Sequence, residues 1–231
     1  MIFKILANYG PLLLAAMGQT LLLALWSLFF ACLIGLFVGI LSVLKSRVCN
    51  IIATIFVDII RGVPMIVLAF FVYFGVPMLM NDNLNWTAMT GSKFTFTALQ
   101  AGIICLSLNC GAYMAEIIRA GILAVDKGQT EAARSLGMTQ GQCMRMIVLP
   151  QAIKNILPAL GNEFVTLVKE SSICSTFGMT ELMFGANATR GATYQVMGPL
   201  LLAAGLYLCM TVPASKLLNY VERRMRRGDV R

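Results

Sequence analysis

Long apolar runs separated by short polar segments dominate the chain. A helix needs roughly 17–25 mostly apolar residues to cross a bilayer, and five runs approach or exceed this length. The Lys, Arg, Asp and Glu residues gather mainly in the interruptions. This pattern predicts an all-α membrane protein with a single transmembrane domain over 1–231. The predicted spans are about 11–44, 51–79, 94–119, 152–169 and 196–218.

Two of these segments have features of their own. The first run is longer than a span requires, which indicates a tilted helix or an interfacial turn. It contains Gly35 and Gly39, whose G-x-x-x-G spacing favours the close approach of a second helix. Residues 170–195 are too polar for a simple span. We expect a short helix or a re-entrant piece there.

The composition supports a protein embedded in a membrane. Hydrophobic residues make up 58% of the chain and charged residues only 12%, about half the fraction usual for a soluble domain. The net charge of +8 is spread in short clusters between apolar runs. That distribution is typical of orientation in a bilayer, and we expect no nucleic-acid partner. The basic tail at 222–231 is expected to lie against anionic membrane lipid.

The basic residues also predict the orientation of the spans. If five spans alternate, one side carries most of them and the other side carries only three. Because the basic side is normally cytoplasmic, we predict a cytoplasmic C-terminus and an external N-terminus. The basic side holds Lys45, Arg47, Arg119, Lys127, Arg134, Arg145, Lys154, Lys216 and the tail arginines, and the other side holds Lys4, Lys93 and Arg190.

A polar segment at about 122–150 interrupts the apolar pattern in the middle of the chain. Its first part favours a helix, with Glu131 near the N-terminus, where a carboxylate suits the helix dipole. Gly137 can end that helix, and a second short helix is expected from about Thr139. Such an element in a cytoplasmic loop offers a rigid contact for a soluble partner. An ordinary amphipathic loop helix is the alternative.

The same segment resembles a known family. It reads E-A-A-x3-G-x9-I-x-L-P without a gap, the pattern of permease subunits of ATP-binding-cassette importers. The resemblance extends over almost the whole chain and is greatest to the polar amino-acid uptake branch, which includes histidine, glutamine and arginine systems. It rests on "FVDIIRGVPMIVLAFFVYFGVP", "AYMAEIIRAGI", "KGQTEAARSLGMT", "LPQAIKNILPALGNEF" and "LVKESS".

The resemblance implies a type I importer fold and a set of partners. Two permease subunits, identical or related, form the pore in the bacterial cytoplasmic membrane. Two ATPase subunits lie beneath it, and an extracytoplasmic binding protein or domain delivers the amino acid. The resemblance further implies that the polar loop docks into a groove on the ATPase. The coupling residues would be Glu131, Ala132, Ala133, Ser135, Leu136, Gly137 and Met138.

The chemistry of the chain agrees with this division of labour. The sequence contains no G-x-x-x-x-G-K-[ST] phosphate loop, so we expect ATP and Mg²⁺ to be bound by a partner ATPase rather than by this chain. It also contains no histidine, which excludes a histidine-based metal site or a Ser-His-Asp triad. We therefore expect a non-catalytic subunit without a metal or cofactor of its own.

The fourth span carries the best candidates for contact with a substrate. Ionisable groups at membrane depth usually face an interior or an aqueous path. A zwitterionic amino acid needs a carboxylate for its ammonium group, which Glu163 supplies, and polar groups to orient it. An interhelical hydrogen-bond seam or a solvated helix end is the alternative. The candidates share one helical face: Asn162, Glu163, Thr166 and Lys169, with Glu170 beside them.

Two further pairs of charges lie in the spans at i, i+3 spacing. Asp58 and Arg61 precede Pro64, and we expect a mutual salt bridge in preference to a substrate clamp. Glu116 and Arg119 end the third span, where a structural pair is favoured over a gate. Two other functional classes remain beside the importer subunit. They are a secondary carrier or channel without an ATPase, and a membrane anchor for another protein. The substrate stays open, because Glu163 fits neutral or cationic amino acids but its carboxylate would meet the α-ammonium group of any amino acid.

Overall fold

The computed structural model describes residues 2–44 and 46–226, and within these ranges every regular element is helical. Lys45 and the tail residues 227–231, which contribute to the predicted orientation in the membrane, lie outside the described ranges. The elements are α1 (Ile2–Val43), α2 (Arg47–Gly62), α3 (Met65–Phe70), η1 (Phe71–Gly75), α4 (Val76–Asp82), α5 (Trp86–Thr90), α6 (Ala98–Leu123), α7 (Lys127–Ser135), α8 (Gln140–Cys143), η2 (Met144–Val148), α9 (Leu149–Glu170), η3 (Ser171–Phe177), α10 (Leu182–Thr193) and α11 (Met197–Arg226).

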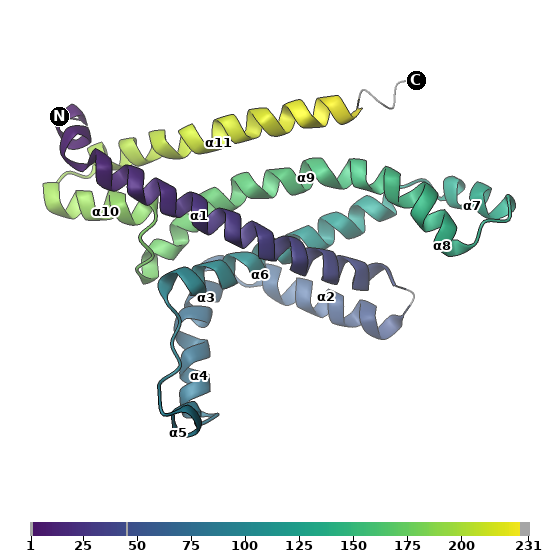
Figure 1. The fold of residues 1–231 in the computed structure, drawn as a ribbon, viewed down its shortest axis with the longest axis horizontal. Coiled ribbons are helices and arrows are strands. Elements are labelled where there is room, and N and C mark those ends of the chain that lie inside the picture. Colours follow the sequence, from purple (N-terminus) through teal and green to yellow (C-terminus); the bar gives the residue numbers. More distant parts are fainter. Residues whose placement is uncertain (1, 45, 227–231) are drawn as a thin grey trace.

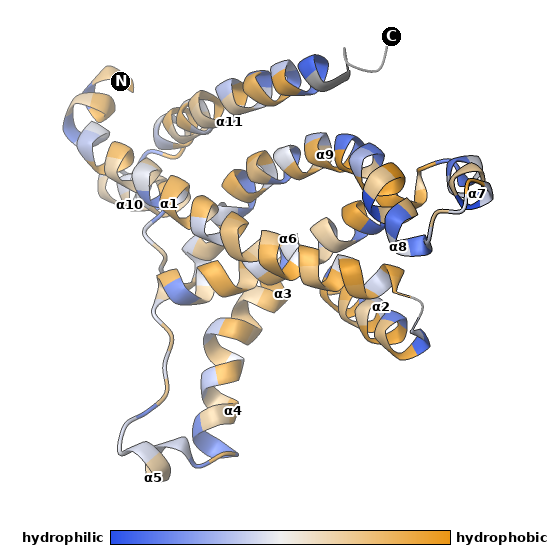
Figure 2. Cartoon of the chain, turned by 45° about the vertical axis from the view of Figure 1, so that its right-hand side comes forward, coloured by the Kyte–Doolittle hydropathy of each residue, from blue (hydrophilic) through white to orange (hydrophobic). Residues whose placement is uncertain are grey.

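The long helices α1, α6, α9 and α11 extend along a common direction (Figure 1). The N-terminus and α10 lie at one end of this bundle, and α7 and α8 lie at the other, which we call the loop end. Hydrophilic residues gather at the loop end, whereas α1 is hydrophobic over most of its length (Figure 2). Four helices of the described chain are long and apolar enough to cross a membrane: Ile2–Val43, Met65–Asp82, Ala98–Leu123 and Met197–Arg224.

The segment predicted as one span at 51–79 is divided in two. Helix α2 ends at Gly62, Val63 is extended with φ −92° and ψ 133°, and α3 begins after Pro64. Proline lacks the N–H that would continue the helix, and it disfavours a helical conformation in the residue before it. The α3–α4 segment turns away from the bundle and carries α5 at its tip (Figure 1).

Both π-helical segments have the same cause. The segment η1 ends at Gly75, two residues before Pro77, and η2 ends at Val148, two residues before Pro150. A proline offers no N–H to the carbonyl four residues back and clashes with it, so the preceding turn widens. In η2 the N–H of Leu149 donates to the carbonyl of Met144, five residues back. As a result α8, η2 and α9 form one helical rod, and the polar loop predicted at 122–150 passes into the segment predicted as the fourth span without a break.

The core is built on close contact between α1 and α6. Gly35 and Gly39 of α1 face this helix, as the G-x-x-x-G spacing favours. A Cβ atom at Gly35 would lie 2.5 Å from the Cβ of Met114 and 3.2 Å from the carbonyl oxygen of Gly111. The two backbones therefore approach more closely than side chains would permit.

We expect the substitution Gly35→Ala to destabilise the protein, because the new methyl group has no room against Met114. Overpacking of this kind costs about 1–3 kcal/mol. Thermal unfolding in detergent should show a lower midpoint than wild type. Gly18→Ala on the same helix is the matched control, since a Cβ there meets no heavy atom within 4 Å. Equal midpoints for the two variants would contradict the close contact.

Residues 170–195 form η3 and α10, which pack against α1 and α11. Glu181 is fully buried and begins α10 by accepting hydrogen bonds from the N–H groups of Met183 and Phe184, at 2.9 and 2.7 Å. Its carboxylate also accepts from the Tyr207 hydroxyl at 2.8 Å. Burial raises the pKa of the Glu181 carboxyl, and these hydrogen bonds oppose the rise. The side chain thus ties α10 to α11.

Candidate functional site

One exposed face of α9 carries polar residues at intervals along the helix. Four polar residues recur within a strip roughly 40° wide, taking 100° per residue. All four are exposed to the outside of this chain. Polar side chains favour water or another polar surface over lipid. The strip is therefore a surface suited to a polar environment. Its members are Gln151, Asn155, Asn162 and Lys169.

The two carboxylates of α9 lie on another face, turned toward α6. The thiol of Cys110 donates to Oε2 of Glu163 at 3.7 Å, and Nδ2 of Asn109 donates to Oε2 of Glu170 at 3.1 Å. Glu163 is half-buried. A carboxylate held only by a weak thiol donor retains most of its capacity to accept hydrogen bonds. Glu163 is therefore the better placed of the two to receive an ammonium group.

The structure divides the residues predicted to share one polar stripe. Asn162 and Lys169 belong to the exposed strip, whereas Glu163 and Glu170 lie roughly 100° further round. The Thr166 hydroxyl donates to the carbonyl of Asn162 in its own helix, at 3.3 Å. The sequence does not predict the partners on α6, because a lone cysteine in an apolar run normally packs as a small hydrophobic residue. The polar Asn109 within an apolar span was the available signal.

Helix α2 has a second polar strip. Asn50, Thr54, Asp58 and Arg61 recur every three or four residues and are exposed. The salt bridge expected between Asp58 and Arg61 is absent from the described structure, so that prediction is wrong. The guanidinium of Arg61 instead lies over the ring of Tyr113 in α6, 4.7 Å from its centroid.

The Glu116–Arg119 pair is present in α6. Nη1 of Arg119 lies 3.3 Å from Oε1 of Glu116, and both side chains are more than a third exposed. These two residues, with Asp58 and Arg61, line a polar cavity of about 220 Å³ between α2 and α6. The four charges predicted as two separate pairs are therefore brought to one place.

The polar loop folds as a compact helical element, α7 followed by the turn at residues 136–138, which we call the corner. Asp126 caps α7 by accepting from the N–H of Gly128 at 2.6 Å. Glu131 consequently lies beyond the first turn, so its expected position near the helix N-terminus is wrong. Gly137 ends the element with φ 82°. Its N–H donates to the carbonyl of Arg134 at 3.0 Å, and the N–H of Met138 donates to that of Ala133 at 3.2 Å, a Schellman motif.

The corner has a buried side and an exposed side. Ala133 is 5% exposed and packs with Cys143 and Val148 of the following rod. Leu136, in contrast, is 84% exposed. Among the predicted coupling residues, Ala133 is buried and Met138 half-buried. The others are exposed: Glu131, Ala132, Ser135, Leu136 and Gly137. An exposed leucine beside exposed polar groups makes this side suited to a protein contact.

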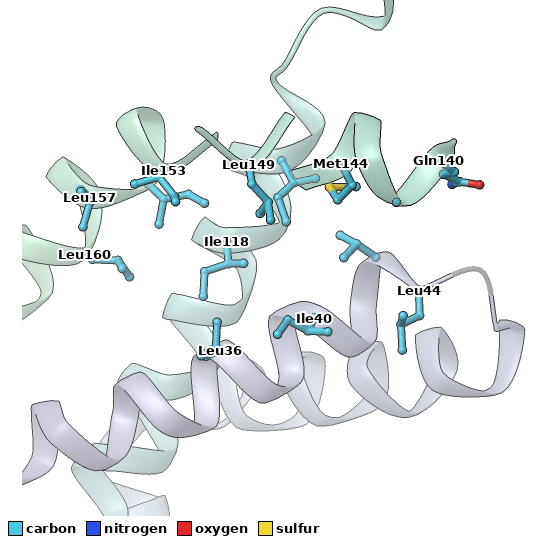
Figure 3. A pocket seen from close by; sticks show the side chains of 14 residues that line it. Leu36, Ile40, Leu44, Ile118, Gln140, Met144, Leu149, Ile153, Leu157 and Leu160 are labelled. Carbon is cyan, nitrogen blue, oxygen red and sulfur yellow. The ribbon is translucent and has the colours of Figure 1, made fainter. Parts of the chain in front are cut away.

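An apolar crevice of about 670 Å³ separates α1 from the start of the rod (Figure 3). Leu36 and Ile40 of α1 face Ile153 and Leu157 of α9, and Ile118 of α6 lies between the two rows (Figure 3). The rod is instead held by α6, where Ile118 packs against Ala152 and Ile156. Over the length of the crevice, α9 is thus attached to α6 and parted from α1.

Comparison with known proteins agrees with this architecture. Residues 31–227 match the family described as "Binding-protein-dependent transport system inner membrane component". The chain belongs to this family. It is a multi-pass component of an inner-membrane transport system, and its homologues are permease components of amino-acid transporters.

Individual relatives cover nearly the full length. The arginine transport system permease protein ArtQ of Bacillus subtilis (strain 168) is 35% identical over 219 residues, 95% of this chain and 94% of ArtQ. A crystal structure of an amino acid ABC transporter with histidines is 40% identical, with a TM-score of 0.84, covering 95% of this chain and 96% of that one. The methionine ABC transporter MetNI, at 24% identity and a TM-score of 0.67 over 95% and 97%, shares the fold.

Proposed function

We propose that this chain is the pore-forming permease subunit of an ATP-driven importer that carries a polar amino acid into the cytoplasm. The observation that carries the proposal is the strip of four polar residues on an exposed face of α9, next to the carboxylate of Glu163. In a membrane, this strip needs water or a second permease subunit in front of it. A water-filled path for a polar solute between two such subunits would place both water and a second subunit in front of the strip.

The substrate site is proposed at Glu163. Its carboxylate would accept the ammonium group of the amino acid, with Asn162, Thr166 and Lys169 offering polar contacts along the path. Lys169, at the far end of α9 from the loop, is placed to attract the substrate's carboxylate as it enters. The arginine named for ArtQ and the histidines named for the solved transporter both contain the ammonium and carboxylate groups that this arrangement would recognise.

The energy is proposed to come from an ATPase subunit docked on the exposed side of α7. Leu136 provides an apolar contact and Glu131 a charged one, both on the surface of the corner. ATP and Mg²⁺ would be bound by that subunit, because this sequence has no phosphate loop. A binding protein or domain would deliver the amino acid at the opposite end of the bundle.

Movement would reach the substrate site through the rod. The corner packs on η2, and η2 continues into α9 without a break, so a displacement of α7 is transmitted along the helix to Glu163. The apolar crevice gives α9 room to tilt relative to α1. We propose that the loop end is cytoplasmic and the N-terminus external, from the basic residues at the loop end, including Arg47, Arg134 and Arg145.

ATP hydrolysis by the reconstituted complex tests this function. The permease, its ATPase and its binding protein are assembled in liposomes, and hydrolysis is measured with a panel of neutral, acidic and cationic amino acids. We expect stimulation by at least one polar amino acid, and only when the binding protein is present. Hydrolysis that responds to no amino acid would contradict an amino-acid importer.

A further inference from the structure

Asp58 and Arg61 present two opposite charges on the exposed face of α2 without pairing to each other. Arg61 is stacked on Tyr113, 4.7 Å from the ring centroid. The nearby carboxylate of Glu116 is already paired with Arg119 at 3.3 Å. Within the described residues, Asp58 takes part in no ion pair or hydrogen bond of its side chain. One negative and one positive group are thus left without a charged partner.

Both charges lie far along α2 from the end at which it begins. Asp58 follows the start of α2 by 11 residues, roughly 16 Å at 1.5 Å per residue. The neighbouring Val57 packs against Val38 of α1 and Ala115 of α6, in the apolar part of both helices. Ionised side chains are costly in lipid, and they are normally found paired or beside water. The face that carries Asp58 and Arg61 is therefore covered by something other than lipid.

We propose that this face meets the same face of a second copy of the chain, with Asp58 of each copy paired to Arg61 of the other. The proposal rests on the function proposed above, in which a path for a polar solute lies between two permease subunits. A two-fold contact is self-complementary, so one acid and one base on the same face produce two identical ion pairs. The two residues differ in height by roughly 4.5 Å along the helix, which the long arginine side chain can span.

The reciprocal pairs form a gate in the path. The cavity of about 220 Å³ opens beside them and is lined by Thr54, Ser42 and the Glu116–Arg119 pair. While both ion pairs are closed, α2 of one copy is held against α2 of the other. A passing amino acid carries an ammonium and a carboxylate group, and it can replace the charges of the second copy as the helices part. The free-energy cost of passing the gate is therefore lower for a zwitterion, which replaces both charges, than for an ion with a single charge.

Complementation between two tagged copies tests the pairing. Asp58→Arg and Arg61→Asp are made in separate, differently tagged chains, and complexes holding both are isolated by successive affinity steps. Each variant alone places like charges together, and we expect it to lower ATP-driven uptake at least about tenfold. In the mixed complex every Arg faces an Asp of the other copy. We expect its uptake to return to within about twofold of wild type.

The Glu116–Arg119 pair is the matched control, because it closes within one chain. Glu116→Arg and Arg119→Glu placed in separate copies should not rescue each other, whereas both changes in one chain should restore the ion pair. If the mixed Asp58→Arg and Arg61→Asp complex stays as inactive as its parents, the reciprocal pairing is wrong. Failure of differently tagged wild-type copies to co-purify would equally overturn it.

A disulfide experiment keeps the proposal testable if the charge variants fold poorly. Copies carrying Asp58→Cys and Arg61→Cys are co-expressed and oxidised, and a linked dimer is expected. Wild type is the control, since it contains seven cysteines of its own, including the exposed Cys32 and Cys209. No linked dimer above the wild-type level would contradict the proposal. ATP-driven uptake by wild type, measured in parallel, shows separately whether the proposed importer function holds.

Discussion

Replacing Gly137 by valine is expected to abolish most ATP-driven uptake while leaving the complex assembled. Gly137 has φ 82°, and no heavy atom lies within 4 Å of the position of an added Cβ. The cost of the substitution is therefore backbone strain rather than a clash, about 1–3 kcal/mol for a non-glycine residue in this conformation. The Schellman bonds of Gly137 and Met138 would be lost as the corner rearranges.

The loss of function follows from the position of the corner. It would join the ATPase to the rod that carries Glu163, so an altered angle at Gly137 disconnects hydrolysis from transport. We expect uptake to fall by about tenfold or more, since each 1.4 kcal/mol is a factor of ten. Uptake and basal hydrolysis are measured in proteoliposomes, with assembly checked by size-exclusion chromatography.

Gly141→Val is the matched control for this variant. Gly141 lies in α8 without a positive φ, and a Cβ there also meets no heavy atom within 4 Å. This variant should transport at close to the wild-type rate. Undiminished uptake by an assembled Gly137→Val complex would show that the corner does not couple the two subunits.

The substitution Glu163→Gln should weaken transport at the substrate site itself. Glutamine keeps the size of the side chain and its contact with Cys110, but it removes the charge that would hold the ammonium group. A hydrogen bond to a charged group contributes about 1.5–3 kcal/mol. We therefore expect the amino-acid concentration giving half-maximal uptake or ATPase stimulation to rise by at least about tenfold.

Glu170→Gln separates binding from structure. Glu170 lies on the same face of α9 and is hydrogen-bonded to Asn109, so glutamine can retain that contact. We expect a smaller change for this variant. If Glu163→Gln matches wild type for every amino acid in the panel, Glu163 is structural and the substrate is held elsewhere along the polar strip.

Much of the fold follows from the pattern of the sequence. The apolar runs give the long helices, and Gly137 ends α7 as its conformational freedom favours. The division at Pro64 and the widened turns before Pro77 and Pro150 are harder to predict from the sequence. A proline in an apolar run predicts a disturbance, but whether the helix breaks or continues with a bulge depends on the packing around it.

The side-chain contacts of the candidate site are also hard to predict from the sequence. A helical wheel places Asn162 and Glu163 about 100° apart, and it does not show which of the two faces a neighbouring helix. Asp58 and Arg61 have the spacing of a salt bridge, but the ring of Tyr113 competes for the guanidinium. That competition depends on α2 lying against α6, which the sequence of α2 alone does not reveal.

Accumulation of a radiolabelled amino acid in proteoliposomes tests whether this chain is part of an ATP-driven importer. The permease is reconstituted with its ATPase and binding protein, and uptake is compared with ATP, without ATP, and with a proton or sodium gradient instead. We expect accumulation that requires both ATP and the ATPase subunit. Uptake driven by a gradient in liposomes that contain only this chain would contradict it.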